Sequence, residues 1–183
     1  SDIKRSLRGA MGSGHDSVAE HVAYTFYITD VSRVLLAQLT RHRLASYSVE
    51  SQRYCTVEKG MIRIPESVKN CDCAKHAIEV AFDCYDMLIK AGVKPEDARY
   101  VLPEGTTTAL VMTMNARELR HFFELRCCNR AQWEIRELAN RMLAICKQEA
   151  PELFRDAGPG CVRGHCPEKH PCGNPFPQVV EKR

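Results

Sequence analysis

Cationic and hydroxyl side chains crowd a short stretch in the first third of the chain. Arg41, His42 and Arg43 are consecutive, and Ser51 and Arg53 follow within ten residues. Cations this close together repel one another unless an anion lies among them. A solvated helix end, whose cations complement the helix dipole, is the alternative interpretation. The serine and the arginine downstream favour an anionic ligand.

A second group of polar residues recurs at helical spacing between Asn115 and Arg126. A rotation of about 100° per residue places Arg117 and His121 on one side of a helix, and Arg126 roughly opposite Arg117 on an apolar stripe. An arginine on such a stripe must reach solvent past the helix end or pair with a desolvated group, because an unpaired buried charge is costly. The spacing predicts two polar sites on opposite faces, although a structural Arg126 remains an alternative.

Histidines and cysteines elsewhere offer weaker signals. His15 and His21 flank a predicted strand without a metal partner at characteristic spacing, and structural hydrogen bonding is the ordinary role of such isolated histidines. A tail rich in Gly and Pro carries possible zinc ligands: Cys161, His165, Cys166, His170 and Cys172. Their gaps fit no standard zinc knuckle, and we predict no metal site.

The elements that must position these residues follow from hydrophobic periodicity. Alternation from Val22 to Thr29 predicts a strand, and Asp30 is expected to cap a following helix that carries Arg41 at its end. Helical spacing and cap residues predict helices at 71–91, 95–101, 115–127 and 132–147, the last buried through Ile135, Leu138, Met142 and Ile145. Short strands are expected at 61–65 and 106–114, and loops at 45–54 and from 158 onward.

Composition limits the class of protein. A chain of 183 residues with 44% hydrophobic composition predicts one core. No segment has the length of a spanning helix or the apolar run of a signal peptide. We therefore expect a cytoplasmic protein without a membrane partner. Arginine outnumbers lysine by 17 to 9, which favours bidentate recognition of anions. Acidic residues interrupt the basic ones, so we expect no nucleic-acid partner. Several of the ten cysteines fall in helical patterns and are expected to be reduced core thiols.

The segment RHRLASYSVESQRY at 41–54 resembles the signature of the flavin-dependent thymidylate synthases, which is R-H-R, seven residues, Ser, one residue and Arg-Tyr. The segments HDSVAEHVAYTF at 15–26, DARYVLP at 97–103, and NARELRHFFELR with AQWEIR at 115–136 extend the similarity to residues 15 to about 154. The resemblance implies an α+β fold in which helices pack on a twisted, mainly antiparallel sheet. It also implies a single domain that assembles as a homotetramer with sites across subunit interfaces.

The resemblance implies two sets of binding residues. FAD would contact His15, Ser17, Glu20, Arg41, His42, Arg43, Asn115, Arg117 and His121. The nucleotide dUMP would contact Gln38, Arg41, Glu50, Ser51, Gln52, Arg53, Arg99 and Arg126. Among these, Arg126 would stabilise negative charge on the uracil ring, Ser51 would orient the ring, and His15 would position the flavin or the folate.

The implied reaction is reductive methylation of dUMP at C5. Reduced FAD would supply the hydride, 5,10-methylenetetrahydrofolate the one-carbon unit, and NADPH the reducing equivalents. Residues 1–157 would form the synthase domain and 158–183 a C-terminal extension found in some members. We expect the family's N-terminal strand and helix, with a serine that contacts flavin, to be missing ahead of His15. Val49 stands where the family usually has Glu or Gln, so that contact is absent or falls to Glu50.

Three rival hypotheses make different predictions. An arginine-rich nucleic-acid-binding domain would be colourless and would bind with steep salt dependence. A zinc protein organised by the tail would unfold when the metal is chelated. An inactive relative would keep flavin without turnover, and Val49 is the residue that suggests it.

Overall fold

The computed structural model describes residues 2–164 and 166–176, and these residues form two compact units. The first unit is drawn from Ser1–Thr25, His42–Ser46 and Thr113–Arg183, and the second comprises Phe26–Arg41 and Tyr47–Met112. The expected His165 and the end of the predicted extension, 177–183, lie outside the described residues.

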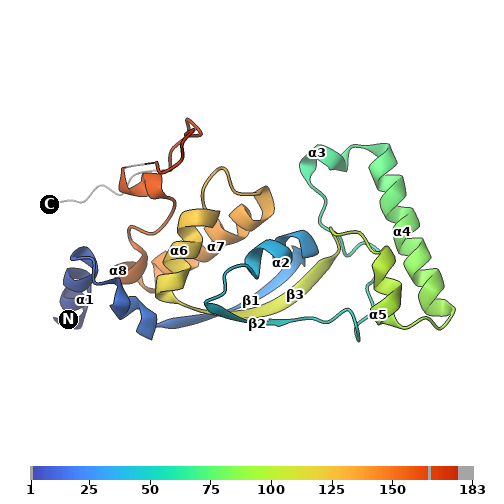
Figure 1. The fold of residues 1–183 in the computed structure, drawn as a ribbon, viewed down its shortest axis with the longest axis horizontal. Coiled ribbons are helices and arrows are strands. Elements are labelled where there is room, and N and C mark those ends of the chain that lie inside the picture. Colours follow the sequence, from blue (N-terminus) through green and yellow to red (C-terminus); the bar gives the residue numbers. More distant parts are fainter. Residues whose placement is uncertain (1, 165, 177–183) are drawn as a thin grey trace. The chain divides into compact units, whose positions relative to one another are not determined.

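A three-stranded antiparallel sheet contributes residues to both units (Figure 1). Its strands are β1 (Ala23–Ser32), β2 (Ala45–Val49) and β3 (Thr107–Asn115), in the spatial order β1-β3-β2. The central strand β3 is the most buried, because β-branched and apolar residues occupy it and neighbours pair with both of its edges. With the helices, this sheet confirms the α+β class.

The first unit is built around two long helices, α6 (Ala116–Arg126) and α7 (Trp133–Glu149). The shorter elements are α1 (Asp2–Gly12), η1 (Asp16–His21), α8 (Pro151–Phe154) and η3 (Gly160–Arg163). Phe123 packs edge-on against Phe154, with ring centroids 6.0 Å apart, and Tyr24 packs against the same ring at 5.5 Å. Burying each such ring contributes about 1.5–3 kcal/mol to the stability of the fold, so these contacts hold α6 and β1 against α8.

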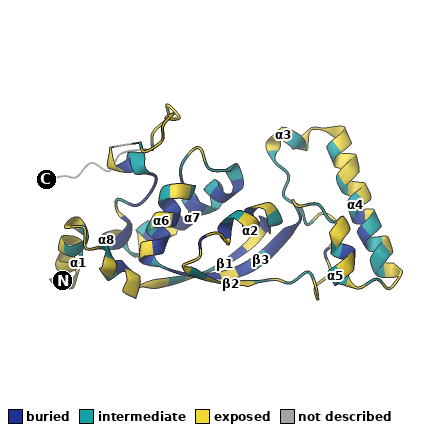
Figure 2. Cartoon of the chain, viewed as in Figure 1, coloured by how far each residue is buried: buried dark blue, intermediate teal, exposed yellow. Residues whose placement is uncertain are grey.

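The second unit contains α2 (Arg33–Leu39), α3 (Glu66–Lys69), α4 (Asp72–Lys90), α5 (Pro95–Ala98) and η2 (Arg99–Val101). Its separate core is formed by Val57, Phe82, Tyr85 and Ala98. The phenol oxygen of Tyr85 accepts the backbone N–H of Val57 at 3.2 Å, which satisfies a polar group inside that core. Figure 2 shows α4 buried along one side only, as its amphipathic pattern predicts.

The strongest sequence patterns are confirmed. The predicted 71–91 helix is α4, and Gly92 follows it with φ of 84°, the left-handed conformation that commonly ends a helix. The predicted strand at 106–114 is β3, and the helices predicted at 115–127 and 132–147 are α6 and α7. Asn115 caps α6 by accepting the N–H of Glu118 at 2.8 Å.

The turn from β1 into α2 differs from the prediction. Asp30 does not cap α2; it lies within β1 with φ of 54° and pairs with Arg63 at 3.5 Å. Ser32 is the cap, and its hydroxyl accepts the N–H of Leu35 at 3.0 Å. Asp tolerates the left-handed region, so the strand bends at Asp30 and continues, and the helix begins two residues later than expected.

Two predictions around the arginine signature are wrong. The helix ends at Leu39, whose carbonyl accepts a hydrogen bond from the hydroxyl of Tyr47 at 2.9 Å, and Arg41 therefore lies beyond the helix. The segment predicted as a loop contains β2, where Ala45, Tyr47 and Val49 alternate with exposed serines. Pairing with β3 gives this serine-rich segment the backbone partners that a strand needs.

Smaller corrections concern burial. The segment 61–65 forms only a single antiparallel bridge, between Ile62 and Thr106. In α7, Leu138 is half-buried and Ile145 is 52% exposed, while Leu143 and Cys146 are buried instead, because the buried stripe drifts around the helix. Core thiols are confirmed for two cysteines, Cys127 and Cys146, and burial raises the pKa of each to about 12. Four others are exposed: Cys55, Cys71, Cys73 and Cys172. Across the described residues, no helix is both long and apolar enough to cross a membrane.

Candidate functional site

His42 lies at the centre of a buried polar cluster in the first unit, with only 5% of its surface exposed. Its Nδ1 lies 3.3 Å from Oε1 of Glu118, and its Nε2 accepts the Nε–H of Arg126 at 3.1 Å. The His42 ring packs edge-on against Phe122, with centroids 5.0 Å apart, and lies 6.2 Å from the ring of His121. The cluster therefore joins one residue of the arginine signature to the polar positions of α6.

Burial sets the protonation state of this cluster. The pKa of His42 is lowered mainly by burial, which disfavours the imidazolium, and the charge of Arg126 lowers it further; the hydrogen bond to Glu118 opposes the shift. A neutral imidazole has one N–H and one acceptor nitrogen. The neutral form with the proton on Nδ1 satisfies Glu118 and Arg126 together.

The expected flavin-binding residues outside this cluster are mostly exposed. Glu20 of η1 forms an ion pair with Arg117 of α6, and both side chains are about half exposed. Three further members are exposed: His15, Ser17 and Arg43. Asn115 is partly buried, and its side chain caps α6. The helical spacing predicts that Arg117 and Arg126 lie on opposite faces of α6. In the structure Arg117 pairs with Glu20, whereas Arg126 binds His42.

A second group of predicted residues gathers in the second unit. Nε and a terminal nitrogen of Arg53 both lie 3.0 Å from Oε2 of Glu96, and Nε of Arg99 donates to the Glu96 backbone carbonyl at 3.0 Å. The Ser51 hydroxyl accepts the backbone N–H of Arg53 at 3.3 Å. Arg53 and Arg99 therefore share Glu96 as a partner, and a hydrogen bond joins Ser51 to Arg53.

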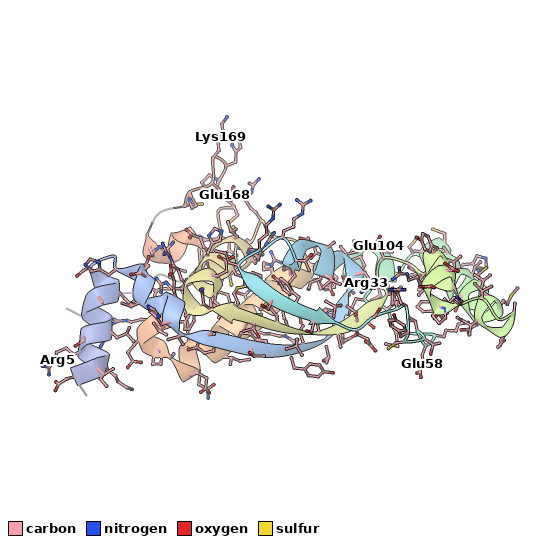
Figure 3. All side chains as sticks on the ribbon, turned by 60° about the horizontal axis from the view of Figure 1, so that its bottom comes forward. Arg5, Arg33, Glu58, Glu104, Glu168 and Lys169 are labelled. Carbon is pink, nitrogen blue, oxygen red and sulfur yellow. The ribbon has the colours of Figure 1, made fainter. Side chains whose placement is uncertain are left out.

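Arg99 and Gln52 also line a surface pocket of about 380 Å³. Its lining is Arg33, Gln52, Arg99, Tyr100, Leu102, Pro103 and Glu104. Figure 3 shows the labelled side chains of Arg33 and Glu104 side by side at this pocket. A terminal nitrogen of Arg33 donates to Oε1 of Gln52 at 2.9 Å, while Nε2 of Gln52 is buried without a hydrogen-bond partner among the described residues.

The charge balance in this pocket favours an anion. The pKa of Arg33 is lowered first by burial and then by the charge of Arg99, and the carboxylates of Glu104 and Glu50 only partly offset this. Two guanidinium groups that destabilise each other, beside an unpaired amide donor, form a site that a phosphate would complete.

The remaining expected dUMP residues of the second unit are Gln38, Arg41 and Glu50. The amide of Gln38 donates back to the Val34 carbonyl of its own helix at 3.4 Å. Arg41 and Glu50 are exposed, and the backbone N–H of Glu50 pairs with the Ala109 carbonyl at 2.9 Å. Val49 is half-buried in β2.

Comparison with known proteins identifies the family. The family described as "Thymidylate synthase complementing protein" matches residues 1–152. A "Flavin-dependent thymidylate synthase" of Geobacter sulfurreducens is 51% identical over 174 residues, which cover 92% of this chain and 75% of that protein. The chain belongs to the flavin-dependent thymidylate synthase family. Proteins of the same description from Clostridium tetani and Pyrococcus abyssi are each 43% identical, over 91% and 92% of this chain and 75% and 74% of their own lengths.

Three further residues of this family member belong to the polar clusters and were missed from the sequence: Arg33, Glu96 and Glu118. Glu118 follows the cap residue Asn115 by three positions, the spacing of a capping box. Its spacing of four residues from Phe122 and eight from Arg126 is a signal that it shares their face of the helix. Arg33 and Glu96 carry no such signal, because their partners are 19 and 43 residues away in the chain.

A cavity of about 170 Å³ in this family member is lined in part by cysteines. Cys128, Cys161, Cys166 and Cys172 are among its lining residues. Among residues 2–164 and 166–176, no three His, Cys, Asp or Glu side chains are placed to hold one metal ion.

Proposed function

We propose that this chain catalyses the reductive methylation of dUMP at C5 to give dTMP. FAD supplies the hydride when bound, 5,10-methylenetetrahydrofolate is the one-carbon donor, and NADPH is the reductant. Family membership supports the reaction, and one structural observation supports the site: Arg126 is held through Nε by a buried neutral His42. This contact leaves the terminal nitrogens of Arg126 for a ligand.

Arg126 is proposed to bind the N3/O2 edge of the uracil ring. A guanidinium placed there stabilises negative charge that develops on the ring as C5 becomes nucleophilic. A charge-assisted hydrogen bond contributes about 1.5–3 kcal/mol, which lowers the free energy of the charged ring relative to the neutral one. Arg126 is partly buried beside His42, so water screens its charge less than it would screen that of a fully exposed cation.

Phosphate recognition is assigned to the second unit. Arg53, Arg99 and Arg41 would hold the phosphate of dUMP, and Gln52 would offer its unpaired amide N–H to the same group. The ion pair of Arg53 with Glu96 is partly exposed, so a phosphate can compete for the guanidinium at low cost. Ser51 would orient the pyrimidine; its hydroxyl accepts a backbone N–H, which is not the contact that activates a nucleophile.

FAD is assigned to the residues that the family resemblance implies. The exposed cations Arg43 and Arg117 and the imidazole of His121 fit the pyrophosphate of FAD, because each donates hydrogen bonds to an anion. Their exposure in a single chain also fits a homotetramer in which neighbouring subunits complete each site. Light scattering of the purified protein measures that assembly, and a monomer at micromolar concentration would contradict it.

The test of the proposed function is dTMP formation by the purified protein. We expect bound flavin and oxidation of NADPH that depends on both dUMP and methylenetetrahydrofolate. A protein that binds flavin without forming dTMP would be an inactive relative. A protein that takes up neither flavin nor dUMP would contradict the proposal altogether.

A further inference from the structure

We propose that Glu118 is a positioning residue that holds His42 in one tautomer and thereby fixes the guanidinium of Arg126 for the nucleotide. The inference rests on the proposed function, because the orientation of Arg126 matters only if Arg126 contacts dUMP. It concerns a carboxylate that the binding sites above do not use.

The three side chains form one continuous chain of hydrogen bonds. Glu118 and Arg126 are eight residues apart on α6 and so share one face, with Phe122 between them. His42 enters from a distant segment, rests its ring on Phe122, and bridges the carboxylate at 3.3 Å and the guanidinium at 3.1 Å. A group that bridges the Glu118 carboxylate and the Arg126 guanidinium must donate to the first and accept from the second, and a neutral imidazole does both.

The side chain of Glu118 is committed to His42. In a reciprocal capping box, the carboxylate at this position turns back to the N–H of the cap residue. Here the Glu118 backbone N–H binds Asn115 as the box predicts, while the carboxylate reaches His42, 76 residues away in the chain. Glu118 is only 9% exposed, and burying a carboxylate is costly without such a partner.

Protonation of His42 would break this arrangement. The imidazolium carries protons on both nitrogens, so Nε2 could no longer accept the Nε–H of Arg126, and two cations would face each other at 3.1 Å. Among the described residues, Glu118, Arg126 and His121 are titratable or charged groups that face His42, and the Phe122 ring packs against it. Burial lowers the pKa of His42, which keeps it neutral, while Glu118 holds the remaining proton on Nδ1.

The first measurement compares two near-isosteric substitutions on the same helix. Glu118→Gln is expected to weaken dUMP binding about tenfold by calorimetry, the change that corresponds to about 1.4 kcal/mol, and to leave the flavin content unchanged. Glu124→Gln is the matched control, because Glu124 pairs with Arg163 at 2.8 Å and takes no part in the His42 cluster. If Glu118→Gln fails to fold, Glu118→Asp keeps the charge and shortens its reach, and it should weaken binding in the same direction.

A double-mutant cycle separates positioning from general stabilisation. If Glu118 acts through Arg126, Glu118→Gln should cost little further dUMP affinity in the Arg126→Lys background. A purely structural Glu118 would cost the same in both backgrounds. The pH profile gives a second criterion: Glu118 raises the pKa of His42 against the effect of burial, so Glu118→Gln should move the acid limb of dUMP binding to lower pH.

Equal affinities of Glu118→Gln and Glu124→Gln, strict additivity with Arg126→Lys, or an unshifted acid limb would each overturn this inference and leave the proposed function standing. Absence of dUMP binding by the unsubstituted protein would instead overturn the proposed function, and the inference with it.

Discussion

The two polar clusters of this chain handle arginine in opposite ways. In the first unit, Arg126 is bound to a histidine that is 5% exposed, and a buried carboxylate completes the chain of contacts. In the second unit, Arg53 shares a half-exposed ion pair with Glu96, and Arg33 lies in an open pocket beside Gln52. The first cluster fixes one orientation before any ligand arrives, whereas the second keeps exchangeable partners.

The two clusters therefore suit different parts of a ligand. A guanidinium that is hydrogen-bonded to a buried partner has a restricted geometry, which suits a planar ring edge that must be recognised in one orientation. Guanidiniums whose partners are partly exposed can exchange them more easily, which suits a phosphate that accepts hydrogen bonds from many directions. Substitutions in the first cluster should therefore change turnover as well as dUMP affinity, and those in the second should change affinity alone.

The largest effect is expected from Arg126→Ala. The substitution removes the cation proposed to stabilise the charged uracil ring, so kcat should fall by about 10²–10³ while the flavin remains bound. The measurement is dTMP formation under saturating substrates. Arg141→Ala is the control, because Arg141 makes only an exposed contact with Glu137 on α7. Near-normal turnover of Arg126→Ala would remove the contrast between the clusters.

Arg33→Ala should affect the second cluster without affecting turnover at saturation. It removes one of two guanidiniums in the pocket and the contact that orients Gln52, so the Kd for dUMP should rise about tenfold. Deoxyuridine, which lacks the phosphate, should bind both proteins equally. Lys59→Ala serves as the matched control, since Lys59 pairs with Asp83 away from the pocket. A loss that is equal for the nucleoside and the nucleotide would contradict the assignment of this pocket to phosphate.

The pH dependence of stability should report the buried cluster. Burial lowers the pKa of His42 in the folded state, so the unfolded chain binds a proton more readily. The free energy of unfolding should therefore decrease as pH falls below the ordinary histidine pKa of about 6.5, by about 1.4 kcal/mol for each unit by which the folded pKa is lowered. Denaturant titrations of the protein and of His42→Gln across this range test this, and parallel curves would refute it.

The smallest effect is expected from Glu96→Gln. Exposed ion pairs contribute about 0–1 kcal/mol, so the free energy of unfolding should change by less than that. Freed from its carboxylate partner, Arg53 should bind dUMP with equal or slightly higher affinity. A large loss of stability or of dUMP affinity would show that this ion pair contributes as much as the His42 cluster does.

Local signals in the sequence determined much of the fold. The amphipathic repeat of α4, the β-branched run of β3 and the Asn115 cap of α6 each depend on neighbours within about four residues, and each is confirmed. The clustering of Arg41, His42 and Arg43 predicts an anion site from the sequence alone, and this site stays a prediction.

The tertiary structure decided the partners of these residues. Strand β2 depends on pairing with β3, and the end of α2 depends on the Tyr47 hydroxyl, so periodicity alone predicted neither correctly. Arg126 was placed on an apolar stripe by its spacing, yet its partner His42 lies 84 residues away, and the carboxylate behind that histidine lies 76 residues from it. Helical periodicity encodes which face a side chain occupies, but contacts between distant segments exist only after the chain has folded.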